Sequence, residues 1–138
     1  MIGDLLPTGD HVARFCDRKY ISERQNVEPG AFMLRKDEKF LSVQWLELLK
    51  KQNRLEEIAE IRLIIAKRMK IRPNTKIAVL NVGRSCDYVS QESGYAIRML
   101  HQPEPSYEAH SGIFGTEQYP ELIAELILET VQEFHLGV

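Results

Sequence analysis

The sequence predicts an α+β fold, with a mixed, mostly antiparallel sheet of about five or six strands and two amphipathic helices packed on one face. Short runs of alternating or continuous apolar residues, typical of strands, recur along the chain. Two longer segments repeat apolar residues at helical spacing. The strand-like runs follow one another instead of alternating regularly with helices, which favours α+β over a βαβ series. The length of 138 residues predicts one globular domain, residues 1–138.

The first strand-like stretches lie in the N-terminal third of the chain. Residues 11–16 alternate, and residues 32–34 and 40–46 are predicted to form a hairpin joined by the charged residues 35–39. One face of the second hairpin strand belongs in the core, and the other face is mixed. The core face carries Leu41, Val43 and Trp45, and the mixed face carries Phe40, Ser42, Gln44 and Leu46.

The first predicted helix extends from residue 54 to about residue 70. Its apolar residues form one broad stripe at 100° per residue. The stripe comprises Leu55, Ile58, Ala59, Ile65, Ala66 and Met69. Arg62 lies near the centre of this stripe and breaks the pattern. Pro73 and Asn74 mark the end of the helix, because proline cannot continue it.

The second half of the chain adds strands and another helix. Residues 76–83 are almost entirely apolar and β-branched, which predicts a central strand covered on both faces. The polar residues 84–94 form either a short helix or a loop. Further strands are predicted at residues 95–101 and 110–115, and an amphipathic helix at residues 116–134.

Composition narrows the functional classes. A net charge of −2 argues against a strongly basic nucleic-acid-binding surface. A local basic patch is the alternative, with Arg18, Lys19, Arg24, Arg68, Lys70 and Arg72 as its candidates. No apolar run is long enough to span a bilayer, and the N-terminus lacks the pattern of a signal peptide. Cys16 and Cys86 form no CxxC pair, which favours two free thiols in a reducing cytoplasm.

Common catalytic and cofactor motifs are absent from the sequence. It has no GxxxxGK[ST] phosphate loop, no GxGxxG after a strand, no HExxH and no GxSxG. His11, His101 and His110 match the ligand count of a catalytic zinc site, but their spacing gives no support for one. Cys86 near Arg84 is a weak candidate nucleophile. We therefore expect neither a metal nor another cofactor.

Several polar residues occupy positions where apolar ones are usual. Arg14 interrupts the first strand and Arg62 the main helix stripe, while His110 opens the HSGIFG segment. In a structural interpretation, Arg62 reaches water along its aliphatic stem or pairs with a carboxylate such as Glu47. In a functional interpretation, an arginine and a histidine together hold an anion, because guanidinium offers two parallel donors and imidazole moves protons.

These observations support three functional hypotheses. The first is a small accessory or interaction domain that binds a protein partner or self-associates through the exposed side of the hairpin, with Phe40, Leu46 and Trp45. The second is a small enzyme or sensor for a phosphorylated or nucleotide-like anion. Its acid–base residues are His11 and His110, and its ligand-binding residues are Arg14, Ser42, Gln44, Trp45, Glu47, Arg62, His101 and Ser111. The third, nucleic-acid binding through the basic patch, is the least supported.

Overall fold

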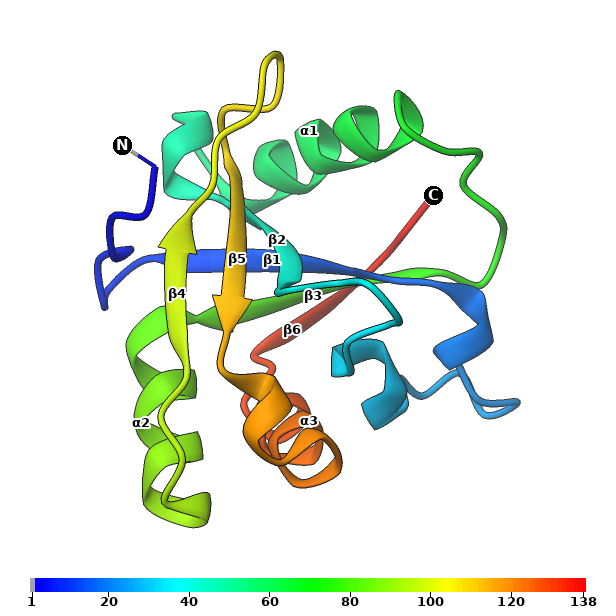
Figure 1. Ribbon diagram of the computed structural model, residues 1–138. Coiled ribbons are helices and arrows are strands. Elements are labelled where there is room, and N and C mark those ends of the chain that lie inside the picture. The colour runs from blue at the N-terminus through cyan, green and yellow to red at the C-terminus, as the bar shows by residue number, and fades with distance from the viewer. Residues whose placement is uncertain (1) are drawn as a thin grey trace.

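A computed structural model describes residues 2–138 and contains one six-stranded sheet with helices on both faces (Figure 1). All adjacent strands are antiparallel, and their order across the sheet is β4-β5-β2-β1-β3-β6. The strands are β1 (His11–Cys16), β2 (Leu41–Trp45), β3 (Lys76–Asn81), β4 (Arg98–His101), β5 (His110–Phe114) and β6 (Glu133–Leu136). The α-helices are α1 (Arg54–Ala66), α2 (Val82–Ser93) and α3 (Pro120–Glu129).

The predicted α+β class is confirmed. Two helices, α2 and α3, pack together on one face of the sheet, while α1 covers part of the opposite face (Figure 1). The two segments predicted to be amphipathic helices therefore lie on opposite sides of the sheet, and a third helix, α2, forms mainly from the polar residues 84–94. Within residues 2–138, no helix is long and apolar enough to cross a membrane.

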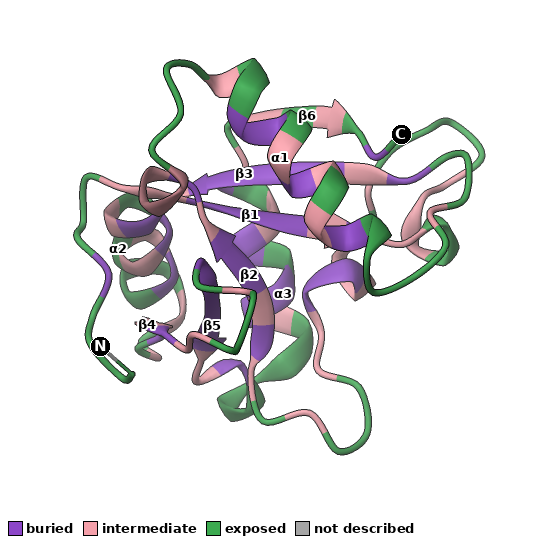
Figure 2. Cartoon of the chain, turned by 90° about the horizontal axis from the view of Figure 1, so that it is seen from above, coloured by how far each residue is buried: buried purple, intermediate pink, exposed green. Residues whose placement is uncertain are grey.

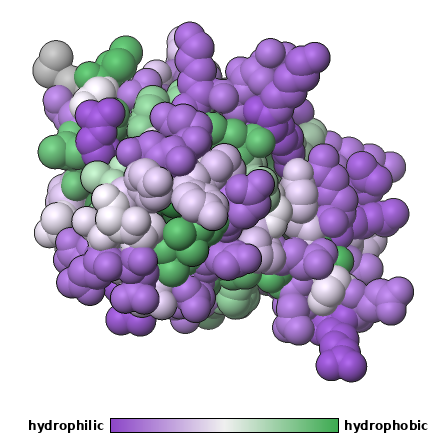
Figure 3. Space-filling model, turned by 60° about the horizontal axis from the view of Figure 1, so that its bottom comes forward, coloured by the Kyte–Doolittle hydropathy of each residue, from purple (hydrophilic) through white to green (hydrophobic). Residues whose placement is uncertain are grey.

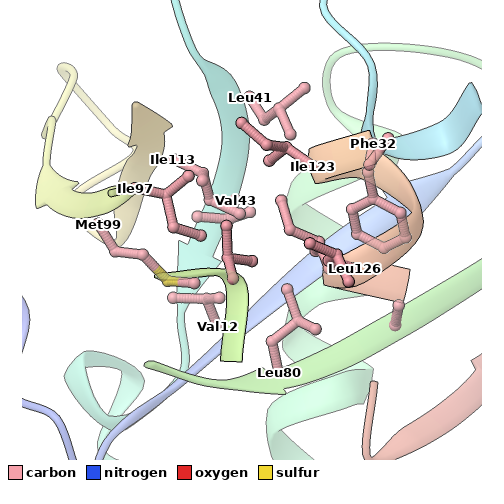
Figure 4. Close-up of a cluster of buried hydrophobic side chains, with 14 of the residues drawn as sticks. Val12, Phe32, Leu41, Val43, Leu80, Ile97, Met99, Ile113, Ile123 and Leu126 are labelled. Atoms are coloured by element: carbon pink, nitrogen blue, oxygen red, sulfur yellow. The ribbon is translucent and has the colours of Figure 1, made fainter. Parts of the chain in front are cut away.

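Alternation along the strands divides the core into two parts. Val12, Leu41, Val43 and Leu80 point toward α2 and α3, where they meet side chains of α3 such as Ile123 (Figure 4). On the other face, a smaller cluster joins the strands to α1; it comprises Ala13, Leu46, Ile58, Ile61, Ile65, Ile77 and Val79. Strand β3 contributes to both clusters, which confirms that it is covered on both faces.

Local capping chemistry sets the starts of two helices. The Asn53 side chain accepts a hydrogen bond from the Glu56 amide at the start of α1, and Asn81 accepts one from the Arg84 amide at the start of α2. Helix α2 ends at Gly94, whose φ of +79° is accessible to glycine without strain. These caps explain why the polar segment after β3 forms a helix rather than a loop.

The predicted hairpin of residues 32–34 and 40–46 is wrong. Residues Pro29–Phe32 form a 3₁₀ turn, and Phe32 is fully buried against the α2–α3 face. Strand β2 instead pairs with β1 and β5, both distant in sequence. The apolar run of residues 31–34 supplies core side chains from an irregular segment, a case that periodicity alone does not distinguish from a short strand.

The single helix predicted for residues 116–134 is also wrong in its extent. A 3₁₀ turn covers Thr116–Gln118, α3 begins at Pro120 and ends at Glu129, and β6 follows. Proline is favoured in the first turn of a helix, because its missing N–H has no partner there. The apolar residues after α3 pair with β3 along the edge of the sheet. Helix α1 likewise ends at Ala66, before the predicted residue 70.

The sheet opens between β1 and β2. These strands pair only at Val12 with Trp45 and at Ala13 with Gln44, whereas β1 pairs with β3 over its whole length. Figure 2 shows β1 and β2 diverging from this short paired region. The opening lies beside the second half of α1, and residues of both strands border a cavity there.

Candidate functional site

A cavity of about 370 Å³ lies where β1 and β2 separate, between the sheet and the second half of α1. Its size falls at the lower end of the range for small-molecule sites. Apolar side chains form much of its wall, and polar groups enter from β1, β2 and β5. The lining residues are Ala13, Arg14, Phe15, Asp17, Lys19, Arg35, Ser42, Val43, Gln44, Ile61, Ile65, Arg68, Met69 and His110.

Arg14 lies at the opening of the sheet. Its side chain starts on the α2–α3 face, yet it borders the cavity because the strands have separated beside it. Its Nε donates to the Ala31 carbonyl at 3.0 Å, and its Nη1 donates to the Ser42 carbonyl at 2.8 Å. Burial lowers the pKa of the guanidinium from its usual value, although arginine stays charged in proteins. Arg14 therefore holds the opening in shape and brings a positive charge next to Ser42.

Gln44 presents an unpaired polar atom at the cavity. The residue is 9% exposed, and its Oε1 has no hydrogen-bond partner among the described residues. Leaving a buried carbonyl oxygen unpaired costs about 1–3 kcal/mol. Because Gln44 lines the cavity, a bound molecule can supply the missing partner. The carboxamide can also rotate and offer its NH₂ group instead.

Ser42 and His110 meet on the same face of the sheet. His110 pairs with Gln44 across the strands, and Ser42 pairs with Gly112, so Ser42 and His110 are diagonal neighbours. The Nε2 atom of His110 lies 3.2 Å from the Ser42 Oγ, and its Nδ1 atom lies 2.8 Å from the Gln102 carbonyl oxygen. A carbonyl only accepts, so Nδ1 carries the proton. In the neutral imidazole, Nε2 therefore accepts the hydrogen of the Ser42 hydroxyl.

Cationic side chains surround the cavity. Four of the lining residues are basic, and one, Asp17, is acidic. Two of the basic side chains, Lys19 and Arg35, lie against the Tyr20 ring, with charged groups 5.1 and 5.5 Å from its centroid. Among the salt bridges of residues 2–138, none involves Lys19 or Arg35. Asp17 and Glu38 act on the Arg35 guanidinium only through longer-range electrostatic interactions, so Lys19 and Arg35 keep charge that can attract an anion.

The loop between β4 and β5 contacts the segment that follows α1, on the other side of the cavity. Arg68 forms a salt bridge with Glu104, and its guanidinium stacks on the Tyr107 ring at 3.8 Å from the centroid. The hydrogen bond from Arg68 lowers the pKa of the Glu104 carboxyl. A Glu104 oxygen also lies 3.8 Å from Nδ1 of His110. This contact fixes the α1 end of the cavity and places a carboxylate beside the histidine.

Four predicted site residues thus border one cavity: Arg14, Ser42, Gln44 and His110. His11 and Glu47 form a separate pair, in which the imidazole Nδ1 lies 2.7 Å from a Glu47 oxygen. Glu47 is therefore not the partner of Arg62 or of Arg14. Arg62 does not enter the cavity; its guanidinium donates twice to the Leu136 carbonyl of β6.

The remaining predicted ligand-binding residues lie on the other face of the sheet. Trp45 and His101 contact each other edge to face at 5.2 Å between ring centroids, and Trp45 donates to Asp10. Ser111 is buried beside them in register with His101. Because His101 and His110 project to opposite faces, the three strand histidines do not converge. No metal-binding group of three or more His, Cys, Asp or Glu side chains is found in residues 2–138.

The two cysteines and the expected contact surface also have defined environments. Both thiols are free, and burial raises the pKa of each to about 11, so the thiolate is scarce at neutral pH. This disfavours Cys86 as a nucleophile. Leu46 is fully buried and cannot contribute to the contact surface predicted for it, whereas Phe40 and Trp45 are half-buried and expose only part of their side chains.

Comparisons with protein-family models, with curated proteins and with solved structures find no match.

Proposed function

We propose that the protein binds a small organic anion in the cavity between α1 and the sheet. The observation that carries this proposal is the buried, unpaired Gln44 Oε1 at the wall of a 370 Å³ cavity. A ligand that donates a hydrogen bond to this atom removes a desolvation cost that the protein bears alone. This gain is additional to the burial of apolar ligand surface.

The charge of the ligand is inferred from the cavity wall. Lys19 and Arg35 supply positive charge without a carboxylate partner in the described salt bridges, whereas Arg68 is offset by Glu104. Guanidinium and ammonium groups bind carboxylates and phosphates through charge-assisted hydrogen bonds. An anionic group at Lys19 and Arg35 therefore has better partners than a neutral or cationic one.

The apolar part of the wall limits the ligand body. Phe15, Ile61, Ile65 and Met69 border the cavity, so a purely ionic species such as inorganic phosphate leaves this surface without contacts. The combination favours a molecule with one anionic group and an apolar or aromatic body. Carboxylates and phosphate monoesters of this size share that chemistry.

A matched panel of ligands tests the proposal by thermal shift. Each anion is paired with a neutral analogue: indole-3-acetate with indole-3-acetamide, and phenyl phosphate with phenol. We expect an anion to raise the melting temperature and its neutral analogue to raise it less, because native-state binding stabilises the fold. Equal shifts within each pair, or no shift, contradict the proposal.

Two variants locate the response. Arg35→Met removes a cation from the wall, whereas Lys36→Met removes an exposed neighbouring cation outside the lining residues. The thermal shift produced by the anion should decrease in Arg35→Met and persist in Lys36→Met. Equal loss in both variants indicates general electrostatic attraction and not this site.

A second candidate, self-association or binding of a protein partner, rests on a different surface. At the open edge of the sheet, Phe134 and Leu136 of β6 are 46% and 64% exposed, and Leu55 and Leu63 of α1 are also exposed. Exposed apolar side chains next to an open strand edge favour association. On the α2–α3 side, by contrast, apolar side chains appear only in small areas between polar ones (Figure 3). Light scattering of Leu136→Asp and the unmodified protein over a concentration series tests this alternative.

A further inference from the structure

We infer that the same cavity is a hydrolytic site, in which Ser42 is the nucleophile and His110 is its general base toward a small anionic ester. This inference rests on the proposed binding of an anion and adds a reaction to it. Nucleophilic catalysis by serine requires a base within hydrogen-bond reach and a third group that orients the base.

The hydrogen-bond directions meet this requirement. The Gln102 carbonyl fixes the proton of His110 on Nδ1, so the lone pair of Nε2 faces the Ser42 hydroxyl at 3.2 Å. Glu104 lies 3.8 Å from Nδ1 and stabilises the imidazolium that forms when Nε2 takes a proton. Glu104 and the Gln102 carbonyl act through His110 and are therefore positioning groups.

The strand register makes this contact accessible. Gly112 lies opposite Ser42 and has no side chain, and the Phe40 ring occupies that space. The same ring packs on Phe114 and His110, at centroid distances of 4.8 and 5.9 Å. Phe40 thus supports the imidazole from the side, while Ser42 remains at the cavity wall.

Two groups are placed to stabilise negative charge near Ser42. The Arg14 guanidinium donates to the Ser42 carbonyl at 2.8 Å and borders the cavity, and Gln44 lies two residues along on the same face as Ser42. A fixed cation and a carboxamide that can offer its NH₂ group suit the oxyanion of a tetrahedral intermediate. Lys19 and Arg35 then bind the anionic end of the ester.

The reaction balances with water as the only co-reactant. The Ser42 Oγ forms a bond to the acyl carbon while its proton passes to His110 Nε2. The ester C–O bond breaks, and the leaving alcohol takes that proton. Water then attacks the acyl-enzyme and gives a proton to Nε2, which returns it to Oγ as the carboxylic acid leaves.

The test compares two chromogenic esters. The mono-4-nitrophenyl ester of glutaric acid is anionic, and 4-nitrophenyl butyrate is neutral. We expect the ratio of the protein-catalysed rate to the spontaneous rate in buffer to be larger for the anionic ester, and Ser42→Ala to lower the catalysed rate by about 100-fold or more. Ser90→Ala, at an exposed serine of α2, should retain the full rate. Diisopropyl fluorophosphate should add one diisopropylphosphoryl group, located on Ser42 by peptide mass spectrometry.

The outcomes separate catalysis from binding. One outcome overturns this inference and leaves the proposed function standing. In it, indole-3-acetate or phenyl phosphate raises the melting temperature, but hydrolysis does not exceed the Ser42→Ala level and Ser42 is not labelled. Hydrolysis of both esters at equal rates with Ser42 labelled supports the nucleophile and contradicts selection of an anion. Circular dichroism of Ser42→Ala shows whether a lost rate reflects lost structure; if it does, labelling of the unmodified protein decides.

Discussion

Arg14 of β1 donates through Nη1 to the carbonyl oxygen of Ser42 in β2, at 2.8 Å, beyond the point where the two strands cease to pair. A side chain thus replaces the backbone hydrogen bonds that a continuous sheet would provide there. The same opening admits the cavity beneath α1 and brings Arg14, Ser42 and Gln44 to its wall. The distortion of the sheet and the candidate site are therefore one feature.

The first prediction concerns this arginine. Arg14→Ala leaves the carbonyls of Ala31 and Ser42 without the donors they now have, so we expect a loss of about 2–4 kcal/mol in the free energy of unfolding. Arg14→Lys should recover only part of it, because one ammonium lacks the forked geometry of guanidinium. Urea unfolding provides the measurement, with the exposed Arg98→Ala as control. An equal effect of Arg14→Ala and Arg98→Ala contradicts the bridging role.

The second prediction concerns the space opposite Ser42. A Cβ atom at Gly112 would lie 2.3 Å from the Cδ1 atom of Phe40, so Gly112→Ala must displace the ring. We expect Gly112→Ala to lower the free energy of unfolding by about 1–3 kcal/mol. Adding Phe40→Ala should relieve the clash, so the double variant should be more stable than the sum of the two single costs predicts. Additive costs in a double-mutant cycle would show that the ring does not occupy this space.

The third prediction concerns the contact between α2 and α3. Thr130 donates to the Ile127 carbonyl, so the buried Ser85 hydroxyl, 2.7 Å away, must donate to Thr130. Ser85→Ala removes one hydrogen bond and should cost about 1 kcal/mol. Thr130→Val removes both and leaves the Ser85 hydroxyl without its acceptor, so it should cost more. Thermal or urea unfolding of both variants gives the order, and the reverse order would refute the assignment of donors.

The fourth prediction concerns acid pH. The hydrogen bond from Arg68 lowers the pKa of the Glu104 carboxyl in the folded state. The ionised carboxylate therefore contributes its full stabilisation of the fold when the pH is above the pKa of the unfolded state, and this contribution is lost as the pH falls through the pKa of the folded state. The Arg68 and Glu104 side chains are 36% and 45% exposed, so solvent screens the pair and the effect should be small. Glu104→Gln should therefore flatten the dependence of stability on pH below about 4.5. An unchanged slope between the unmodified protein and Glu104→Gln would show that the pair contributes nothing.

Local patterns were sufficient to predict most of the sheet and the class of the fold. The strand at residues 11–16 follows from alternation, and β5 follows from the short, glycine-bracketed run at residues 110–115. Strand β3 follows from its nearly unbroken apolar run, although it ends at Asn81 and not at residue 83. The hairpin prediction failed because the apolar residues 31–34 serve tertiary packing and do not form a strand. Phe32 fills the core from a 3₁₀ turn. Strand β6 was missed because its apolar residues continue the helical spacing of α3.

The site was predictable only in part. Arg14 and His110 stood out as polar residues within strands, and the mixed face of β2 indicated Ser42 and Gln44. Their convergence depends on the register of β2 with β5 and on the separation of β1 from β2, which involve residues nearly 70 positions apart along the chain. Arg35 carries no local signal, because exposed arginines are common in loops. Arg68 appeared in the sequence only as a member of the candidate basic patch, and basic residues are common at helix ends.

The most direct test of the central claim is to map where an anion binds. Two-dimensional ¹H–¹⁵N spectra of the protein, titrated in turn with indole-3-acetate and phenyl phosphate, report each backbone amide separately. We predict that at least one of the two anions causes saturable changes in the amide chemical shifts. These changes should be concentrated around the cavity, at Ala13, Gln44, Ile61 and His110. A second hollow of about 330 Å³, bordered by Leu48, Lys67 and Tyr107, serves as internal comparison. Shifts concentrated in that hollow, or no saturable shift with either anion, would contradict the account.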